Sequence, residues 1–160
     1  MGVEVRTAIV SDAHGIAVVH VEAWREAYAH LLPAQVLANL SVAQRAARWA
    51  ERIAAPTPTV WVAEDSGVIV GWATSSSGHA PDAPRDLELD GIYVRASHHG
   101  SGAGQALLDA AIDSSPAFLW VASDNPRAWA FYARNGFVAD GATDTLPLGG
   151  VPVPVERLVR

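Results

Sequence analysis

Residues 87–112 read LELDGIYVRASHHGSGAGQALLDAAI, and this stretch decides how the rest of the chain is organised. The strand-like pattern of residues 87–94 predicts a strand. A helix is predicted after it, because four apolar residues recur on one helical face: Leu107, Leu108, Ala111 and Ile112. Between strand and helix lie three closely spaced glycines, Gly100, Gly102 and Gly104. A glycine-rich turn at a helix N-terminus presents unpaired backbone N–H groups, so it suits a phosphate or pyrophosphate.

Two common phosphate-binding loops do not fit this turn. A P-loop ends in Lys-Ser or Lys-Thr, whereas Gln105 and Ala106 follow the last glycine here. A Rossmann loop has its third glycine at the position of Gln105 and starts directly at the strand end, whereas residues 95–99 intervene here. The turn therefore belongs to neither of these two classes of nucleotide-binding protein.

Two motifs, in the correct order, resemble the GNAT superfamily of acyl-CoA-dependent N-acyltransferases. The phosphate loop of that family, Arg/Gln-x-x-Gly-x-Gly/Ala, is similar to residues 99–104 (HGSGAG), which follow the hydrophobic residues 92–94 (IYV). His99 stands where the family usually has Arg or Gln. Residues 125–137 (NPRAWAFYARNGF) resemble the second signature, Asn-x-x-Ala-x-x-Phe-Tyr-x-x-x-Gly-Phe.

The resemblance implies that acetyl-CoA is a co-substrate and that it binds along these two motifs. A backbone N–H near Ile92 is the implied donor to the oxyanion. The residues expected to bind the cofactor are Ile92, Tyr93, Val94, His99, Gly100, Gly102, Ala103, Gly104, Gln105, Asn125 and Tyr132. The implied activity is direct transfer of an acetyl group to a primary amine of a small molecule or peptide, in a ternary complex. A second interpretation is an acyl-CoA-binding sensor or interaction module with the same fold and little turnover.

Tyr132 is the predicted proton donor for the departing thiolate. It lies seven residues after Asn125, which places both on one face of a helix. A phenol has an unperturbed pKa near 10, so it keeps its proton at neutral pH. The alternative is a core tyrosine beside Phe131, and spacing alone favours that alternative. The resemblance to the second signature favours the catalytic role.

Glu88 is the predicted base, since relatives with Glu-x-x-x-Ile-Tyr-Val spacing use the Glu in that role and residues 88–94 match it. In an unbroken strand Glu88, Asp90, Ile92 and Val94 share one face, and a strand bulge would break this parity. A partly buried carboxylate has a raised pKa and can accept a proton through water. Asp90 is the rival base, and an alternative role for either carboxylate is to bind a cationic substrate.

The acceptor is expected to meet Trp24 and Tyr28, near the C-terminal end of the first predicted helix, together with Asp90. In the resembled family this helical region covers the acceptor side of the cleft. The alternative is that Trp24, Tyr28 and Trp49 simply pack in the core, and their size and hydrophobicity favour that alternative.

Composition excludes several other classes of protein. The chain has 160 residues, 50% hydrophobic and 18% charged, so we expect one globular domain over residues 1–160. It contains no cysteine, which excludes disulfides and thiolate metal sites, and the adjacent His98 and His99 point apart in most backbones, so no metal is expected. The net charge of −6 disfavours nucleic acid and favours a cationic amine. With no apolar run of membrane-spanning length and no signal peptide, we expect a cytoplasmic monomer or homodimer without a membrane partner.

The remaining patterns predict an α/β (α+β) fold with a mixed sheet. Strands are predicted at residues 3–9, 59–64, 68–75, 87–94, 117–122, 137–139 and 153–159. Four helices are predicted: one from Ser11 or Asp12 to about residue 32, ended by Pro33, one at 41–53 capped by Ser41, one after the glycine-rich loop, and one capped by Asn125. The GNAT resemblance implies a mostly antiparallel seven-stranded sheet in which strands 87–94 and 117–122 run parallel and splay apart to admit the pantetheine arm.

Overall fold

The computed structural model describes residues 2–78 and 80–160. Over these residues the strands are β1 (Glu4–Thr7), β2 (Thr59–Asp65), β3 (Val68–Ser77), β4 (Leu87–Val94), β5 (Phe118–Ala122), β6 (Val138–Leu148) and β7 (Val151–Val159). The α-helices are α1 (Ala13–Ala27), α2 (Ala34–Ala38), α3 (Val42–Ala54), α4 (Ala103–Ile112) and α5 (Pro126–Arg134). Two short 3-10 turns, η1 (Val10–Asp12) and η2 (Ala96–His98), precede α1 and α4.

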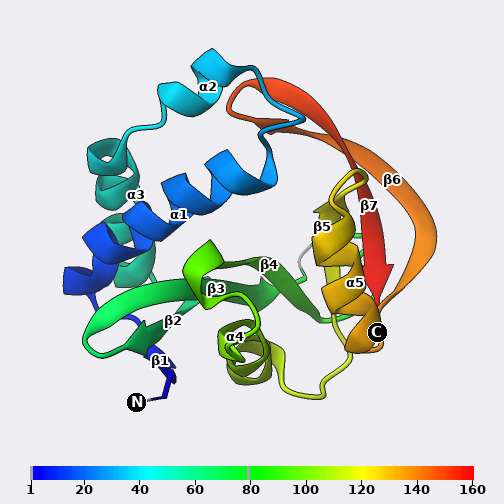
Figure 1. Ribbon diagram of the computed structural model, residues 1–160. Coiled ribbons are helices and arrows are strands. Elements are labelled where there is room, and N and C mark those ends of the chain that lie inside the picture. The colour runs from blue at the N-terminus through cyan, green and yellow to red at the C-terminus, as the bar shows by residue number, and fades with distance from the viewer. Residues whose placement is uncertain (1, 79) are drawn as a thin grey trace.

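All seven strands form one sheet in the order β1-β2-β3-β4-β5-β7-β6. Every neighbouring pair is antiparallel except β4 and β5, which are parallel. These two strands are paired only at Glu88 and Phe118, near their N-terminal ends, and they then diverge (Figure 1). The predicted fold class is therefore confirmed, including the splayed parallel pair in the middle of the sheet.

Helices cover both faces of the sheet. On one face α1 and α3 pack on the sheet through a buried cluster that includes Ile16, Trp49 and Trp72. On the opposite face α4 packs through a second cluster that includes Leu107 and Ala73 (Figure 1). The glycine-rich loop and α4 are thus on the face away from α1, at the end of β4 where the sheet opens.

A bulge in β4 reverses the side-chain pattern expected for that strand. Thr74 of β3 pairs with Gly91, but the next residue, Ser75, pairs with Leu89, so Asp90 is an extra residue. Ahead of the bulge Leu89 faces α4, and after it Ile92 faces α4 as well. Glu88 therefore does not share a face with Ile92, as an unbroken strand would require; it faces α1 and α3 instead.

The first helix is shorter than predicted, and a second short helix follows it. α1 ends at Ala27, five residues before the predicted end, and the chain then turns, because the backbone N–H groups of Leu31 and Leu32 both donate to the carbonyl of Tyr28. Pro33 does not stop α1; it stands at the N-cap of α2. Five residues are too few for a helical hydrophobic period, so the pattern could not reveal α2.

The predicted strand at residues 137–139 was wrong in length, because β6 runs from Val138 to Leu148. Nearly every residue of β6 is exposed, since it is the last strand of the sheet and pairs only with β7. Alternating hydrophobicity appears only where one face of a strand is buried, so this strand has no such signal. The β6–β7 hairpin reaches α2, where Leu148 and Val151 pack with Leu37 (Figure 1).

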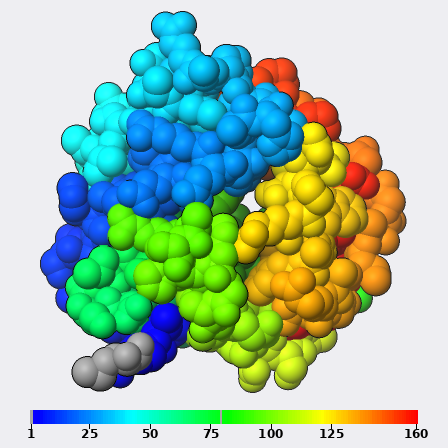
Figure 2. All heavy atoms as spheres, in the orientation of Figure 1, coloured from blue at the N-terminus to red at the C-terminus, as the bar shows by residue number. Residues whose placement is uncertain are grey.

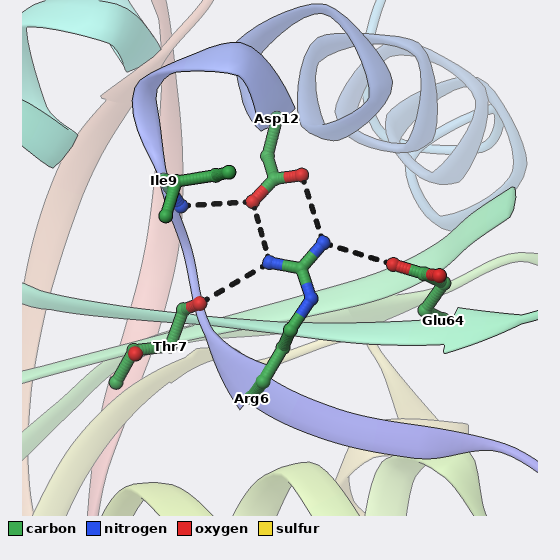
Figure 3. A network of polar contacts seen from close by, with 5 residues as sticks. All are labelled: Arg6, Thr7, Ile9, Asp12 and Glu64. Carbon is green, nitrogen blue, oxygen red and sulfur yellow. Dashed lines mark hydrogen bonds and ion pairs between the residues drawn. The ribbon is translucent and has the colours of Figure 1, made fainter. Parts of the chain in front are cut away.

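Asp12 has a different role from the predicted one. It occupies the N-cap position of α1, but its side chain makes no cap hydrogen bond there. Instead the Arg6 guanidinium donates to both of its oxygens, at 2.8 and 3.0 Å, and a second carboxylate, Glu64 of β2, accepts from the same guanidinium at 2.8 Å (Figure 3). The backbone N–H of Ile9 also donates to Asp12. This network ties β1, β2 and the start of α1 together, whereas Ser41 and Asn125 accept from the helix amides as predicted.

Candidate active site

A cleft of about 980 Å³ lies where β4 and β5 diverge. Its walls come from α1, the end of β4, the glycine-rich loop, the start of α4 and the exposed side of α5. Figure 2 shows the hollow on this face, between the blue atoms of α1, the green atoms around the glycine-rich loop and the yellow atoms of α5. Of the residues predicted to bind the cofactor, all except the buried Ala103 line this cleft.

The glycine-rich loop has the backbone conformation that the sequence analysis anticipated. Gly100 and Gly102 have φ values of 77° and 91°, and Gly102 is the N-cap of α4. A Cβ at either position would meet no atom within 4 Å. Within the described part of the chain, the backbone N–H groups of Gly102, Gly104 and Gln105 have no hydrogen-bond acceptor. Together with the partial positive charge of the α4 N-terminus, they form a surface that suits an anion.

The two histidines before this loop point in different directions. Nε2 of His98 lies 2.9 Å from a carboxylate oxygen of Asp65, the last residue of β2. Nε2 of His99 lies 3.1 Å from the carbonyl oxygen of Val94, so its ring folds back onto the end of β4. Over residues 2–78 and 80–160, no group of three or more potential metal ligands comes together.

Tyr132 lines the cleft from α5 and is only 7% exposed. Its ring packs with Leu108 and Phe137 on the α4 side of the sheet. Burial, followed by the nearby Tyr28, raises the pKa of Tyr132, so the phenol keeps its proton. Tyr132 is thus both packed in the core and present at the cleft, and the two interpretations of the sequence are compatible.

A side-chain bridge fixes α5 against α4. Nε2 of Gln105, in the first turn of α4, donates to Oδ1 of Asn135 at 2.8 Å. Asn135 in turn donates to the carbonyl of Phe131, at 3.0 Å. At the other end of α5, the Asn125 side chain accepts from the N–H of Ala128, which caps the helix. The start of α4 and Tyr132 are therefore held by one connected set of contacts.

The charges of Glu88 and Asp90 interact with one another, and neither residue is among the described residues that line the cleft. Burial, and then the charge of Asp90, raises the pKa of Glu88. Burial also raises the pKa of Asp90, while the Ser76 hydroxyl donates to it at 3.0 Å and opposes that shift. Glu88, which is half-buried, and Asp90, whose residue is exposed overall, together form an acidic site on the α1 face that could hold an ammonium group or accept its proton.

Trp24 and Tyr28, the other predicted acceptor contacts, are 8% and 5% exposed and lie beneath the cleft surface. Their place at the cleft is taken by Tyr93, whose hydroxyl oxygen is 2.7 Å from that of Tyr28. Both side chains are therefore packed in the core, and neither is among the described residues that line the cleft.

Five charged or titratable residues at the cleft were not predicted as site residues from the sequence: Glu26, His30, His98, Arg127 and Arg134. Arg127 and Arg134 lie inside the second motif, and their spacing of seven residues, two helical turns, was the available signal. These two cations give the cleft a local charge opposite to the net charge of −6 for the chain.

Comparisons with known proteins agree with this geometry. A model described as "Acetyltransferase (GNAT) family" matches residues 21–137. A probable N-acetyltransferase of Mycobacterium tuberculosis (strain ATCC 25618 / H37Rv) is 29% identical over 163 residues, covering 95% of this chain and 90% of that protein. An uncharacterized N-acetyltransferase of the same strain is 38% identical over 118 residues, covering 70% of each chain.

Two solved structures share the whole fold. A GCN5-related N-acetyltransferase from Rhodopseudomonas palustris has a TM-score of 0.74 and 23% identity, covering 100% of this chain and 96% of its own. A putative acetyltransferase from Salmonella typhimurium, solved with its cofactor acetyl-CoA, has a TM-score of 0.69 and 20% identity, covering 100% and 94%. No described helix is both long and apolar enough to cross a membrane. The family match and the similarity to these relatives show that this chain belongs to the GNAT family of acetyltransferases.

Proposed function

We propose that the protein transfers an acetyl group from acetyl-CoA directly to a primary amine of a small molecule or peptide, within a ternary complex. One observation carries this proposal: the free backbone amides at the start of α4 and the phenol of Tyr132 line the same cleft. A pyrophosphate group and a reacting thioester, at the two ends of one elongated molecule, require that combination.

The residues present fit acetyl-CoA. The amides of Gly102, Gly104 and Gln105 would bind the pyrophosphate, and no Cβ stands over Gly100 or Gly102 to keep it away. Arg127 would add positive charge from α5. The pantetheine arm would lie in the gap where β4 is not paired with β5. The Salmonella structure was solved with its cofactor acetyl-CoA, which supports the choice of this cofactor.

The reaction needs a neutral amine, a hydrogen-bond donor for the oxyanion and a proton for the departing thiolate. The neutral amine attacks the carbonyl carbon, and the π electrons move onto the oxygen, which needs a hydrogen-bond donor such as the N–H near Ile92. When the tetrahedral intermediate collapses, the C–S bond breaks and its electrons go to sulfur. The Tyr132 hydroxyl gives its proton to that thiolate, and the high pKa of Tyr132 means that the proton is present when it is needed.

Glu88 is the base we propose for the ammonium proton, through a water molecule, and Asp90 is the proposed contact for the cationic acceptor. Both carboxylates face α1 and α3, on the opposite side of the sheet from α4, so an acceptor would approach from that side. Trp24 and Tyr28 are proposed to shape this side of the site from beneath Tyr93. A cytoplasmic location and a monomeric or homodimeric state remain predictions from the sequence.

The test is release of free CoA from acetyl-CoA by the purified protein, with and without a panel of amines, amino acids, aminoglycosides and peptides. We expect thiol release that depends on one class of amine, with an acetylated product of matching mass. Acetyl-CoA binding without amine-dependent release from any of them would instead indicate a sensor or interaction module.

A further inference from the structure

The three tyrosines of the chain lie at the cleft or beneath it, although they come from three separate segments. Tyr28 directly follows α1, Tyr93 is in β4 and Tyr132 is in α5. Tyr93 packs with side chains on the α1 and α3 face of the sheet, and Tyr132 packs on the α4 face. Both line the cleft, so they reach it from opposite faces of the sheet.

Tyr93 is held in a fixed position. Its hydroxyl is hydrogen-bonded to that of Tyr28 at 2.7 Å, and its ring lies 5.1 Å from the Trp72 ring and 6.1 Å from the parallel ring of His20. Tyr28 is fixed in turn, since its ring meets Trp24 edge-on at 5.3 Å. Neither phenol can turn its oxygen away without disturbing this aromatic cluster.

One phenolic hydrogen of this pair is left without an acceptor. Two phenols carry two hydrogens, and the hydrogen bond between Tyr28 and Tyr93 uses one of them. Over residues 2–78 and 80–160, no other acceptor bonds either oxygen. Tyr28 is buried, and only Tyr93 lines the cleft. When Tyr28 donates to Tyr93, the hydrogen of Tyr93 is free for a molecule bound in the cleft.

We infer that Tyr93 is a second catalytic hydroxyl, which donates a hydrogen bond to the carbonyl oxygen of the bound thioester, and that Tyr28 is the positioning residue that orients it. This inference rests on the proposed function. Tyr132 serves the sulfur from the α4 face, and Tyr93 would give the carbonyl oxygen a side-chain donor in addition to the backbone N–H near Ile92. That oxygen is where negative charge develops, so a preorganised donor acts there most strongly.

The proton of Tyr93 is not transferred in this step. As the amine attacks, the electron pair moves onto the carbonyl oxygen and the hydrogen bond from Tyr93 shortens. When the C–S bond breaks, the pair returns to the carbonyl and the thiolate takes the proton of Tyr132. Burial raises the pKa of Tyr93 well above its ordinary value, so it remains a neutral donor across the working pH range.

A binding experiment tests the inference without turnover. Two stable analogues of acetyl-CoA are compared by calorimetry: a ketone, in which CH₂ replaces the thioester sulfur, and an alkyl analogue, in which CH₂ also replaces the carbonyl. The native protein should bind the ketone about tenfold more tightly, and Tyr93→Phe should remove this preference. Tyr132→Phe is the matched control, since it deletes a hydroxyl from the same cleft but should keep the preference.

Kinetics add a second readout. Tyr93→Phe should lower kcat by about 10²–10³-fold, the usual effect of losing one oxyanion donor, with little change in the affinity for free CoA. Tyr28→Phe should lower kcat less, and it should cause no further loss in the Tyr93→Phe background, because it acts only through Tyr93. If the decreases in kcat of Tyr28→Phe and Tyr93→Phe add in the double variant, Tyr28 has a packing role. The same conclusion follows if Tyr28→Phe lowers only the melting temperature.

The outcomes separate this inference from the proposed function. If the native protein binds neither analogue, the proposed use of acetyl-CoA is wrong. If it binds both, and Tyr93→Phe still prefers the ketone, then acetyl-CoA binds but Tyr93 is not the carbonyl donor.

Discussion

Glu88 and Tyr93 face the same side of β4, although five positions separate them and an unbroken strand would place them on opposite sides. The extra residue, Asp90, reverses the alternation between them. The bulge therefore puts the proposed base on the same face as the Tyr28–Tyr93 pair, while Ile92 faces α4. Bulges beside active sites commonly re-aim a side chain in this way.

The acid side of the pH–rate profile should report Glu88. Burial and the charge of Asp90 raise the pKa of Glu88, and the base form is the deprotonated one. The rate should therefore fall as pH falls through a value above the ordinary pKa of about 4.3 for Glu. Glu88→Gln should remove this dependence and slow the reaction by about 10²–10⁴-fold. Asp90→Asn should keep the fall in rate at low pH but move it to lower pH, because the charge that raises the pKa of Glu88 is removed. If the fall in rate is lost in Asp90→Asn and kept in Glu88→Gln, Asp90 is the base.

Gly102→Val should weaken acetyl-CoA binding by about 10²-fold or more, on the order of 3 kcal/mol, because the side chain would stand over the free amides of the loop. Gly141→Val is a matched control. Gly141 has a φ of 89°, close to the 91° of Gly102, and a Cβ there also meets nothing within 4 Å. Both variants should suffer similar backbone strain, but only Gly102→Val should lose affinity in calorimetry. Equal affinity in the two variants would disprove the amide site.

Tyr132→Phe should slow the chemical step by about 10²–10⁴-fold while acetyl-CoA affinity is retained. The loss should appear in kcat, because the proton is needed only in the transition state. A thioester with a more acidic thiol should recover part of it, since that thiolate leaves without help. Single-turnover kinetics and melting curves of both proteins test this prediction. If Tyr132→Phe slows the chemical step by less than threefold, Tyr132 has a packing role only.

His20 should make the fold sensitive to mild acid. It is buried, and its Nδ1 accepts from Nε1 of Trp49 at 3.2 Å. Burial, and then Arg45 and Arg52, lowers the pKa of His20 from 6.5 to about 3. The unfolded chain thus binds a proton below pH 6.5 that the folded protein does not, so stability falls as pH drops from 6.5 toward 3.

The slope from this one group is about 1.4 kcal/mol per pH unit. Urea unfolding between pH 6.5 and 5.5 measures it at pH values where most carboxylates remain ionised in the unfolded chain. His20→Gln should reduce the slope by that amount, whatever its effect on absolute stability. His14→Gln, at an exposed position on the same helix, should leave the slope as it is in the native protein.

Local patterns in the sequence determined most of the scaffold and the backbone conformation of the glycine-rich loop. The strand at residues 87–94, the glycine spacing, the caps at Ser41 and Asn125, and the number of strands all depend on interactions between residues a few positions apart. Such interactions are written in short stretches of sequence, so they can be read without a structure. The positive charge of the cleft was harder to predict, because Arg127 and Arg134 contribute to it only once α5 forms one wall of the cleft.

Tertiary structure alone decided which side chains meet. The Asp90 bulge depends on how β4 pairs with β3, and nothing within residues 87–94 specifies that register. The full length of β6 depends on pairing with β7, because an exposed edge strand needs no apolar alternation. The hydrogen bond between Tyr28 and Tyr93 joins residues 65 positions apart, and it exists only because α1 packs across the end of β4. Contacts of this kind are set by the packing of whole elements, which no local pattern records.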